Sequence, residues 1–576
     1  MFKPLRTPLV GFLLASGVAP LFAQAPKPEP AIAQAPIVLK STTRLVQVNV
    51  IVQNKQGEPV EGLKKEDFTI QDQGNEQKVA TFSANSAAPR DSFPASILPP
   101  NVFINRIGQT GRTPGSVAVI LFDALNTSIQ EQVYARQQVV KFLSQLQPQD
   151  HAAIYVLTSR LIVLNEFTQD SSSLLRAIEQ LRGYSSAPLD ASKPVPIDQG
   201  TFAVKTPESD EMASRLKGFL EAADGQISDF ANINRAETTT SAIEAIANHV
   251  ARIPGRKSLV WVSGSFPMTI GFDGETLSQP GREQRSFREE LEHAARALNQ
   301  ANMAIYPVDA RGLMTSPRFS AANNSRFDPR SPMRDLNPDQ NVIDTMIVLA
   351  DRTGGRASYN TNDIGGAVGR ALADGQYTYT LGFYPTHGKW DGKFHELKVH
   401  VNEKGLTLRF RKGYFASPDP PNGPTESQAA LDAAIASPVE WTNLDVEVTL
   451  KAFEASSRTL EIQVAMDTHE LLLEPKNGRW SGKLYLLFGQ LGAGDKGITS
   501  VKETLTMNLK QDTYEKLLKI GTKFTGRVIL SPDTVNLRVI AQDVSSGAIG
   551  TLTIPIKKFL GAATIPSGGQ PVAQKP

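Results

Sequence analysis

Side chains that could do chemistry gather in this sequence where one apolar run ends. Residues 116–128 read SVAVILFDALNTS, so the run stops at Asp123, and Asn126, Thr127 and Ser128 follow within five positions. A continuous apolar run is typical of a parallel strand covered on both faces, and ligands of such sheets bind just beyond the carboxyl ends of the strands. We therefore predict a site at this strand end, in which Asn126 and Ser128 contact a partner.

Two further apolar runs predict strands beside the first. Residues 257–262 (KSLVWV) stop at a serine-rich turn, in which Ser265 is a third expected partner-binding residue, and residues 303–308 (MAIYPV) stop at Asp309. Alternating strands and helices predict an α/β domain over residues 115–375, with a doubly wound, mostly parallel sheet of the Rossmann type. The helices are predicted by apolar residues at helical spacing over 129–146, 171–181, 212–230, 241–253, 287–299 and 342–351.

β-rich segments flank the α/β domain on both sides. Valine alternates with other residues from Val46 to Val52, which predicts a small β-domain over residues 43–88, and a β-hairpin extension is predicted over residues 376–416. A series of strand patterns predicts a carboxyl-terminal β-sandwich over residues 431–560. The first β-domain is too small to bury a sufficient core alone, so we expect it to pack against the domain after it. Composition predicts flexible linkers at 26–42, 89–114 and 417–430 and a disordered tail at 561–576.

The amino terminus has the pattern of a secretory signal peptide. Lys3 and Arg6 precede an apolar stretch over residues 9–22, and an Ala-Gln-Ala cleavage pattern ends the segment 1–25. We therefore expect an exported protein, periplasmic or secreted, with no transmembrane segment after the signal is cleaved.

Composition excludes several classes of site and partner. The chain of 576 residues has no cysteine, which rules out disulfides and thiolate metal sites. Its 60 basic and 58 acidic residues give a net charge of +2, and the basic residues are spread along the chain. Nucleic acid is therefore not expected as a partner.

Several ordered motifs together resemble one protein family. They are TRLVQVNVIV and KKEDFTIQDQG near the start, then SVAVILFDALNTS, PGRKSLVWVSGSFP, AIYPVDARGL, LADRTGG, YTLGFYP, DGKFHELKVHV and RKGYFA. The chain is similar over residues 43–416 to the secreted bacterial VWFA-related domain family, in which a von Willebrand factor type A (vWA)-like domain is flanked by β-domains. The resemblance is weaker for the carboxyl-terminal sandwich.

The resemblance implies a metal-ion-dependent adhesion site at the strand end. In vWA domains the site opens with DxSxS and is completed by a threonine and an aspartate from later loops. Asp123 opens the motif here, but Leu125 replaces its first serine, and Thr127 stands at the second. Thr240 matches the later threonine, and Ser263 stands where the last aspartate belongs. The implied site is therefore degenerate.

A divalent cation would bind weakly to such a site. Mg²⁺ is normally held through one or two carboxylates plus water, and only Asp123 supplies a carboxylate, so no cofactor is expected beyond weakly bound Mg²⁺ or another divalent ion. Asp309 is a possible replacement ligand, but the vWA strand order places it two strands away, roughly 10 Å at the usual strand spacing. The alternative is that Asp123 only caps a helix amino terminus.

Other residues that could do chemistry have structural explanations. Residues 492–497 (GAGDKG) match GxGxxG, but a strand pattern comes after them, so they predict a hairpin loop rather than a dinucleotide site. His395 and His400 fall on opposite sides of a predicted strand and are expected at the surface. Arg256 and Lys257 are expected to be solvated residues near the ends of elements. We recognise no catalytic motif.

Three functional hypotheses remain open. The first is an exported, non-catalytic protein-binding module for adhesion or assembly, whose partner lies in the cell envelope or outside the cell. The second is an envelope scaffold whose β-domains make the contacts. The third is an envelope hydrolase using Asp123 and Asp309, which is disfavoured because no nucleophile and base show a recognisable spacing.

Overall fold

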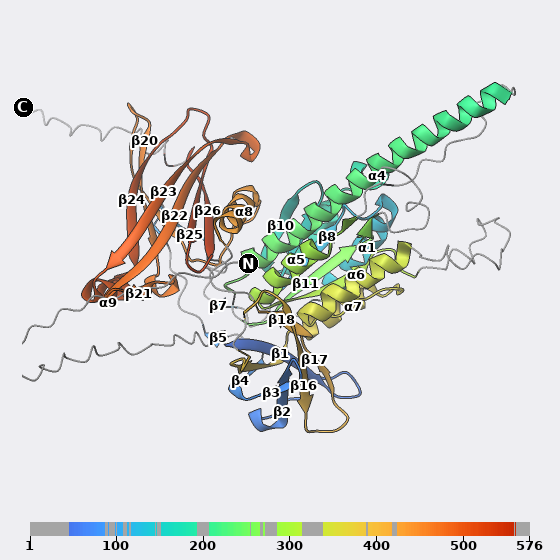
Figure 1. The fold of residues 1–576 in the computed structure, drawn as a ribbon, viewed down its shortest axis with the longest axis horizontal. Helices are drawn as coiled ribbons and strands as arrows, with labels where there is room; N and C mark the ends of the chain where they lie inside the picture. Colours follow the sequence, from blue (N-terminus) through green and yellow to red (C-terminus); the bar gives the residue numbers. More distant parts are fainter. Residues whose placement is uncertain are drawn as a thin grey trace, which may run out of the picture. The chain divides into compact units, whose positions relative to one another are not determined.

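A computed structural model describes most of the chain (Figure 1). The described residues are 45–86, 90–91, 98–99, 101–106, 112–113, 117–144, 146, 151–192, 207–253, 255–264, 266, 269–270, 285–313, 338–387, 390–416, 423–557 and 559. The predicted signal peptide, the linker 26–42 and the tail 561–576 lie outside these residues. Among the described helices, none is long and apolar enough to span a membrane.

A five-stranded sheet forms the centre of the α/β domain. Its strand order is β10-β9-β8-β11-β14, and all neighbours are parallel except β10, which pairs antiparallel with β9. Every residue of β8, β11 and β14 is buried, as their continuous apolar runs require. The strands are β8 (Val117–Asp123), β9 (His151–Leu157), β10 (Leu161–Thr168), β11 (Lys257–Ser263) and β14 (Met303–Asp309).

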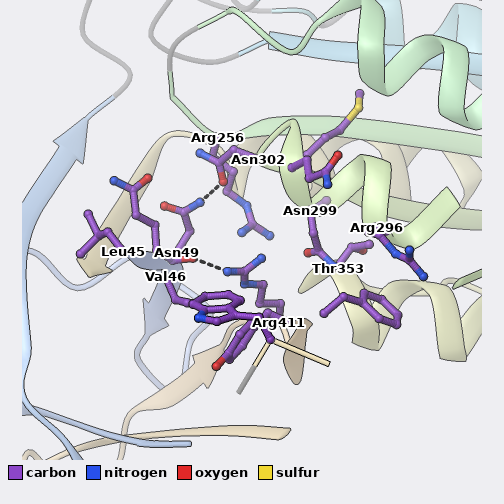
Figure 2. A pocket seen from close by; sticks show the side chains of 16 residues that line it. Leu45, Val46, Asn49, Arg256, Arg296, Asn299, Asn302, Thr353 and Arg411 are labelled. Atoms are coloured by element: carbon purple, nitrogen blue, oxygen red, sulfur yellow. Dashed lines mark hydrogen bonds between the residues drawn. The ribbon is translucent and has the colours of Figure 1, made fainter. Parts of the chain in front are cut away.

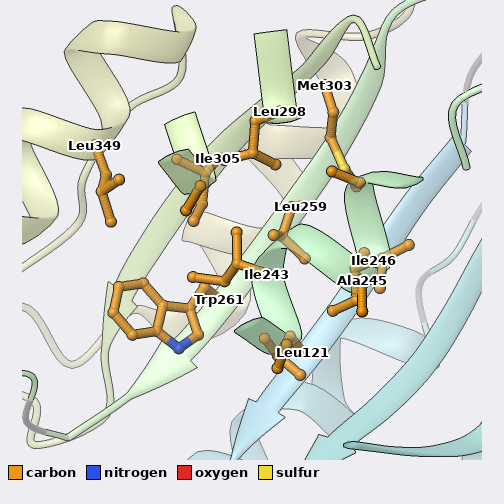
Figure 3. Packing of buried hydrophobic residues seen from close by; sticks show 14 of the residues in the cluster. Leu121, Ile243, Ala245, Ile246, Leu259, Trp261, Leu298, Met303, Ile305 and Leu349 are labelled. Carbon is orange, nitrogen blue, oxygen red and sulfur yellow. The ribbon is translucent and has the colours of Figure 1, made fainter. Parts of the chain in front are cut away.

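Helices cover both faces of this sheet. Alternate residues of β8 face two different clusters, so that Leu121 packs with α4, α5 and α6, whereas Phe122 packs with α1, α2 and α7. Figure 3 shows Leu121, Ile243 and Trp261 in the first cluster. This mixed sheet between two helical layers is a vWA-type fold. The helices are α1 (Ile129–Leu143), α2 (Ser171–Gln180), α3 (Ala187–Ala191), α4 (Pro207–His249), α5 (Arg288–Gln300), α6 (Pro338–Thr353) and α7 (Ile364–Ala373).

Helix α4 is one continuous helix of 43 residues, although the sequence predicts two shorter helices over the same region. The intervening residues 231–240 (ANINRAETTT) include β-branched threonines that are poor helix formers in isolation, but packing against the sheet overrides this weak preference. Large apolar side chains are exposed along α4 between residues 216 and 230, including Phe219 and Phe230 at 69% and 71% exposure.

The first β-domain and the predicted hairpin extension form one β-sandwich. Strand β1 pairs with both β15 and β17, and β2 pairs with β16, so the predicted separation of 43–88 from 376–416 is wrong. Each segment contributes strands to both sheets, so neither sheet is complete without the other segment. One sheet is β17 (Thr407–Arg409), β1 (Val46–Gln53), β15 (Tyr377–Phe383) and β4 (Val79–Ser86), and the other is β18 (Gly413–Phe415), β16 (Phe394–Val401), β2 (Phe68–Asp72) and β3 (Asn75–Gln77).

Two predicted linkers contain regular structure. Strand β6 (Val102–Ile104), within the predicted linker 89–114, pairs with β19 of the carboxyl-terminal sheets because an edge strand there accepts its backbone groups. Helix α8 (Gly423–Ala436) begins within the predicted linker 417–430, and its Leu431 and Ala434 are buried. Short strands also form at β5 (Arg90–Asp91), β7 (Arg112–Thr113), β12 (Thr269–Ile270) and β13 (Arg285–Ser286).

The carboxyl-terminal region has two further sheets around one apolar cluster. One sheet has the strand order β24-β20-β19-β6. The other has the order β21-β22-β25-β26, and β23 also pairs with β22. The GxGxxG match lies in the loop between β22 and β23, as predicted. The elements are β19 (Glu447–Glu454), β20 (Thr459–Met466), β21 (Glu474–Lys476), β22 (Arg479–Leu491), β23 (Gly497–Leu509), α9 (Gln511–Ile520), β24 (Thr522–Ile529), β25 (Asn536–Asp543) and β26 (Ile549–Pro555).

Candidate functional site

Asp123 ends β8 as a fully buried carboxylate that accepts four hydrogen bonds. Asn126 donates its backbone N–H to Oδ1 at 3.0 Å and its side-chain amide to Oδ2 at 2.8 Å. Trp261 Nε1 and Ser263 Oγ, both from β11, each donate to Oδ2 at 2.9 Å. Burial raises the pKa of Asp123, whereas the hydrogen bonds from Asn126, Ser263 and Trp261 lower it.

The buried, positively charged guanidinium group of Arg235 belongs to the same hydrogen-bond network. Arg235 of α4 is 2% exposed, and its Nε donates to Oδ1 of Asn126 at 2.9 Å. Asn126 thereby connects the guanidinium to the carboxylate of Asp123. Burial lowers the pKa of Arg235 to about 10, and the charge of Asp123 acts in the opposite direction.

Thr127 is held within the loop after the strand. Its hydroxyl donates to the backbone oxygen of Asp123 at 2.5 Å and accepts the backbone N–H of Gly264 at 2.9 Å. A side chain on Gly264 would come within 3.1 Å of the backbone oxygen of Asn126 and within 2.9 Å of Glu131 Oε2. The close approach of the two loops therefore depends on this glycine.

Thr240 does not face the predicted site. Its hydroxyl donates to the backbone of Ala236, one turn earlier in α4, at 3.0 Å. The preceding residue, Thr239, accepts the side-chain amide of Asn126 at 2.7 Å. Because consecutive residues lie about 100° apart around a helix, the match at Thr240 is wrong by one position.

Ser128 and Ser263 have structural hydrogen bonds. Ser128, and not Asp123, caps α1, because its hydroxyl accepts the N–H of Glu131 at 3.4 Å while the Glu131 carboxylate accepts the N–H of Ser128 at 2.9 Å. The alternative that Asp123 is the helix cap is therefore wrong. Ser263 supplies a hydroxyl donor to Asp123 where the family motif has an aspartate. Ser265 lies outside the described residues.

The carboxylate of Asp309 is bound by Arg311 and does not belong to the Asp123 network. It lies opposite Ser263 in the β11–β14 pair and thus two strands from Asp123, as expected. Arg311 binds both of its carboxylate oxygens, with Nε to Oδ1 and a terminal nitrogen to Oδ2, each at 2.9 Å. The two carboxylates that the hydrolase hypothesis requires are therefore not brought together.

The residues around Asp123 do not fit a divalent cation. N–H and O–H groups cannot ligate a metal through their hydrogens, and four such groups point at the only carboxylate of the motif. The positive charge of Arg235 in the same network further disfavours a second cation. The hydrogen bonds to Asp123 therefore hold the end of β8 in place within the protein.

A pocket that the sequence does not predict lies at the opposite end of the same strands. It encloses about 510 Å³ and reaches the backbone where β14 begins, at Met303. Figure 2 shows three arginines around it, from before β11, from α5 and from the β17–β18 loop. Its lining consists of Leu45, Val46, Gln47, Asn49, Arg256, Arg296, Asn299, Gln300, Asn302, Met303, Ala304, Thr353, Trp390, Arg411, Tyr414 and Phe415.

The pocket is strongly biased toward positive charge. The Nε atoms of Arg256, Arg296 and Arg411 are buried and find no hydrogen-bond acceptor among the described residues. No aspartate or glutamate belongs to the lining that the structure describes. Burial lowers the pKa of Arg411 to about 10, which still leaves it charged at neutral pH. The arrangement can therefore bind an anionic group.

The arginines are partly anchored by backbone oxygens. A terminal nitrogen of Arg256 donates to Gly354 O, and one of Arg411 donates to Gln47 O, both at 2.6 Å. The guanidinium of Arg296 lies 5.0 Å from the centre of the Phe415 ring. These contacts hold the three side chains in place around the pocket.

Arg256 and Lys257 are buried, so the expectation that they are solvated is wrong. Arg256 is 5% exposed and Lys257 is 2% exposed. Lys257 Nζ donates to the backbone oxygens of Ile253 and Gly255, at 2.5 and 3.2 Å. The acceptors come from the turn before β11, so the charges are satisfied by backbone groups that the sequence pattern does not reveal.

Comparison with known proteins gives structural matches only. No protein-family model and no curated protein matches the chain. The similar solved structures include an aerotolerance-related membrane protein from Bacteroides fragilis, with 15% identity, a TM-score of 0.22, and coverage of 45% of this chain and 98% of that one. A vWF domain of a type V pilus tip protein from Porphyromonas gingivalis has 10% identity, a TM-score of 0.23, and coverage of 45% and 96%.

A von Willebrand factor type A structure from Catenulispora acidiphila has 11% identity and a TM-score of 0.23, and the match covers 62% of this chain and 79% of that one. TM-scores this low support no conclusion about function. The vWA-type fold is evident instead from the order and direction of the chain's own strands, with Asp123 at the end of the central strand. Over this central part the chain resembles vWA domains.

Proposed function

We propose that this protein is an exported, non-catalytic binding module that holds an acidic segment of a partner protein in the arginine-lined pocket. The observation that carries the proposal is the set of three arginines, Arg256, Arg296 and Arg411, that line one cavity whose described lining holds no aspartate or glutamate. The described lining has no carboxylate to balance the three guanidinium groups, and a carboxylate ligand would supply one.

The chemistry of the pocket suits carboxylates. A guanidinium matches a carboxylate in shape and can bind it through two parallel hydrogen bonds. The amide side chains of Asn49, Asn299 and Asn302 lie around the same space, and each already donates one N–H within the chain. In metal-dependent vWA domains, a partner's acidic side chain completes the coordination of the metal ion. The arginines would bind the same kind of acidic side chain without a metal ion.

The size and composition of the pocket favour a peptide segment as the occupant. A cavity of about 510 Å³ has room for more than one side chain. Trp390 and Phe415 provide apolar walls beside the arginines, which suits an acidic residue flanked by apolar ones. The two hydroxyl groups of the described lining are engaged within the chain, that of Thr353 with Leu349 O and Ile305 N and that of Tyr414 with Asp72, which favours binding over catalysis.

Calorimetric titration with a matched pair of peptides tests this function. The probes are an acidic hexapeptide containing three glutamates and the same peptide with glutamines. We expect only the acidic peptide to bind the mature chain, more weakly at high salt, and Arg411→Gln to weaken binding at least about ten-fold because it removes a charge-assisted hydrogen bond.

The control is Arg527→Gln on β24. Arg527 is 77% exposed and lies in the carboxyl-terminal sandwich, so this variant should bind the acidic peptide like the wild type. Equal affinity in wild type and Arg411→Gln, in protein whose unfolding transition is unchanged, would contradict the proposed pocket. Binding of inorganic sulfate without binding of the acidic peptide would overturn the proposal of a protein partner.

A further inference from the structure

The amino-terminal β-sandwich gathers three side chains that can ligate a metal ion. Asp72 ends β2, His395 lies on β16, and His387 comes after β15. Strand pairing explains their proximity. Asp72 lies opposite Leu397, two residues from His395 on the same face of β16, and Tyr414 of β18 lies directly opposite His395. Strands β2, β16 and β18 thus bring Asp72, His395 and Tyr414 together, and His387 reaches the same place from the segment after β15.

The ligand atoms are close enough to share one ion. One atom from each of Asp72, His387 and His395 lies within 4.8 Å of the others. His387 Nε2 is 3.4 Å from Asp72 Oδ2, and His395 Nδ1 is 3.6 Å from Asp72 Oδ1. Two ligands of one tetrahedral zinc ion lie about 3.4 Å apart, given bond lengths of about 2.1 Å. The cluster therefore needs only small side-chain shifts to close around an ion.

Two of the buried atoms in this cluster have no hydrogen-bond partner in the described part of the chain. They are Oδ1 of Asp72 and Nδ1 of His395, and these residues are only 2% and 8% exposed. The expectation that His395 lies at the surface is therefore wrong, whereas His400 on the opposite face of the strand is exposed. A buried carboxylate oxygen and a buried imidazole nitrogen, 3.6 Å apart, leave a position between them for a shared cation.

The surrounding groups have the placement that metal-binding histidines require. The other ring nitrogen of His395, Nε2, is 3.7 Å from Oδ1 of Asp391, so a small shift would bring this carboxylate to the position from which it orients a metal-ligating histidine. The Tyr414 hydroxyl is 2.8 Å from both Asp72 Oδ2 and His387 Nε2. It is thus placed beside the cluster, where a fourth ligand or a bound water would lie.

We propose that Asp72, His387 and His395 form a binding site for a divalent transition-metal ion, with Zn²⁺ as the best match. Two imidazole nitrogens and one carboxylate oxygen suit zinc and disfavour Mg²⁺ and Ca²⁺, which prefer all-oxygen sites. The ion would fasten the loop carrying His387 to strands β2 and β16. Because Tyr414 and Trp390 also line the arginine pocket, the ion would fix one wall of that pocket. The site does not depend on the proposed function.

Metal titration of the mature chain, after treatment with a chelator, tests this site. We expect one Zn²⁺ to bind per chain, Co²⁺ to give the visible absorption of a tetrahedral site with nitrogen and oxygen ligands, and Zn²⁺ to raise the melting temperature. His387→Gln and His395→Gln should each weaken Zn²⁺ binding at least about 100-fold. His387 lies in a loop with a side chain that is 20% exposed, so its variant tests the site with little risk to folding.

His400→Gln is the matched control, because His400 lies on the same strand but on its exposed face. It should bind Zn²⁺ like the wild type. The proposal is overturned if the wild type binds no Zn²⁺, or if both His387→Gln and His395→Gln retain wild-type affinity. It is also overturned if Asp123→Asn, rather than these variants, abolishes binding, since the ion would then occupy the end of β8.

Discussion

Nε1 of Trp261 donates a 2.9 Å hydrogen bond to Oδ2 of Asp123, from one buried strand to the end of its neighbour. The indole therefore has two roles, since it also packs in the core at 0% exposure. Ser263 and Asn126 donate to the same oxygen. Three protein donors therefore saturate this oxygen.

Removing the indole N–H should destabilise the fold even when the aromatic packing is kept. We expect Trp261→Phe to lower the free energy of unfolding by about 2–4 kcal/mol, because a buried carboxylate loses a donor and a small cavity opens. Urea unfolding measures this change. Trp480→Phe is the control, since its N–H donates to Gln511 at an exposed site, and it should cost less than about 1 kcal/mol. Equal costs for the two variants would contradict the role assigned to Trp261.

Asp123 and Arg235 should be energetically coupled through Asn126. In a double-mutant cycle of Asp123→Asn and Arg235→Gln, we expect a coupling energy of about 1–3 kcal/mol, because each single variant leaves the other buried charge without its counterpart. Urea unfolding of the four proteins gives this value. The same cycle on Glu461 and Arg527, an exposed pair at 3.7 Å, should give almost none. A negligible coupling at Asp123 would show that Arg235 does not balance its charge.

The central sheet could be predicted because its strands carry continuous apolar runs. Residues 117–123, 257–263 and 303–309 are short, mostly apolar and bounded by polar turns, which favours covered strands, and their polar ends place Asp123, Ser263 and Asp309 at one end of the sheet. The hydrophobic pattern of a segment predicts its secondary structure from that segment alone. The prediction is therefore right where the pattern matches the burial of the segment in the fold.

The candidate sites could not be predicted in the same way, because they depend on contacts between distant segments. Thr239 and Thr240 differ only in their position around α4, which a motif match cannot resolve. The three pocket arginines are spread from 256 to 411, and each is buried by a different element. Asp72 is more than 300 positions from His387, so no spacing in the sequence suggests a shared ligand site.

The stability of the protein should depend on pH through Lys257. Burial lowers its pKa to about 7 in the folded chain, against 10.5 as its ordinary value. Between pH 7 and 10.5 the unfolded chain therefore binds more protons than the folded chain, so this residue makes stability rise with pH, by at most about 1.4 kcal/mol per pH unit. Burial raises the pKa of Glu244 from 4.5 to about 7, so Glu244 changes the stability mainly below pH 7.

Urea unfolding at pH 7, 8 and 9 isolates this contribution. We expect Lys257→Met to flatten the rise of stability with pH relative to the wild type. Lys398→Met should keep the wild-type slope, because Lys398 is 57% exposed in its side chain. Parallel slopes for Lys257→Met and the wild type would mean that the ammonium group keeps an ordinary pKa in the folded chain.

Gly354 should be essential for the close approach of the β17–β18 loop to α6. Its φ of +77° favours glycine, and a side chain there would lie 2.6 Å from Arg411 N and 2.9 Å from the carbonyl carbon of Phe410. Gly494 has a similar φ of +68°, but a Cβ atom at Gly494 would have nothing within 4 Å. Gly494→Ala should therefore cost only about 1 kcal/mol of backbone strain, whereas Gly354→Ala should cost about 3 kcal/mol or more.

The difference between these two variants measures the steric contact alone, because the backbone strain is common to both. Gly354→Ala would also displace Arg411, so it should weaken binding of the acidic hexapeptide, while Gly494→Ala should leave that binding unchanged. Urea unfolding and calorimetric titration give the two readouts. If both variants lost the same stability and both bound the peptide normally, the loop would have room to move and Arg411 would not be held in place by this contact.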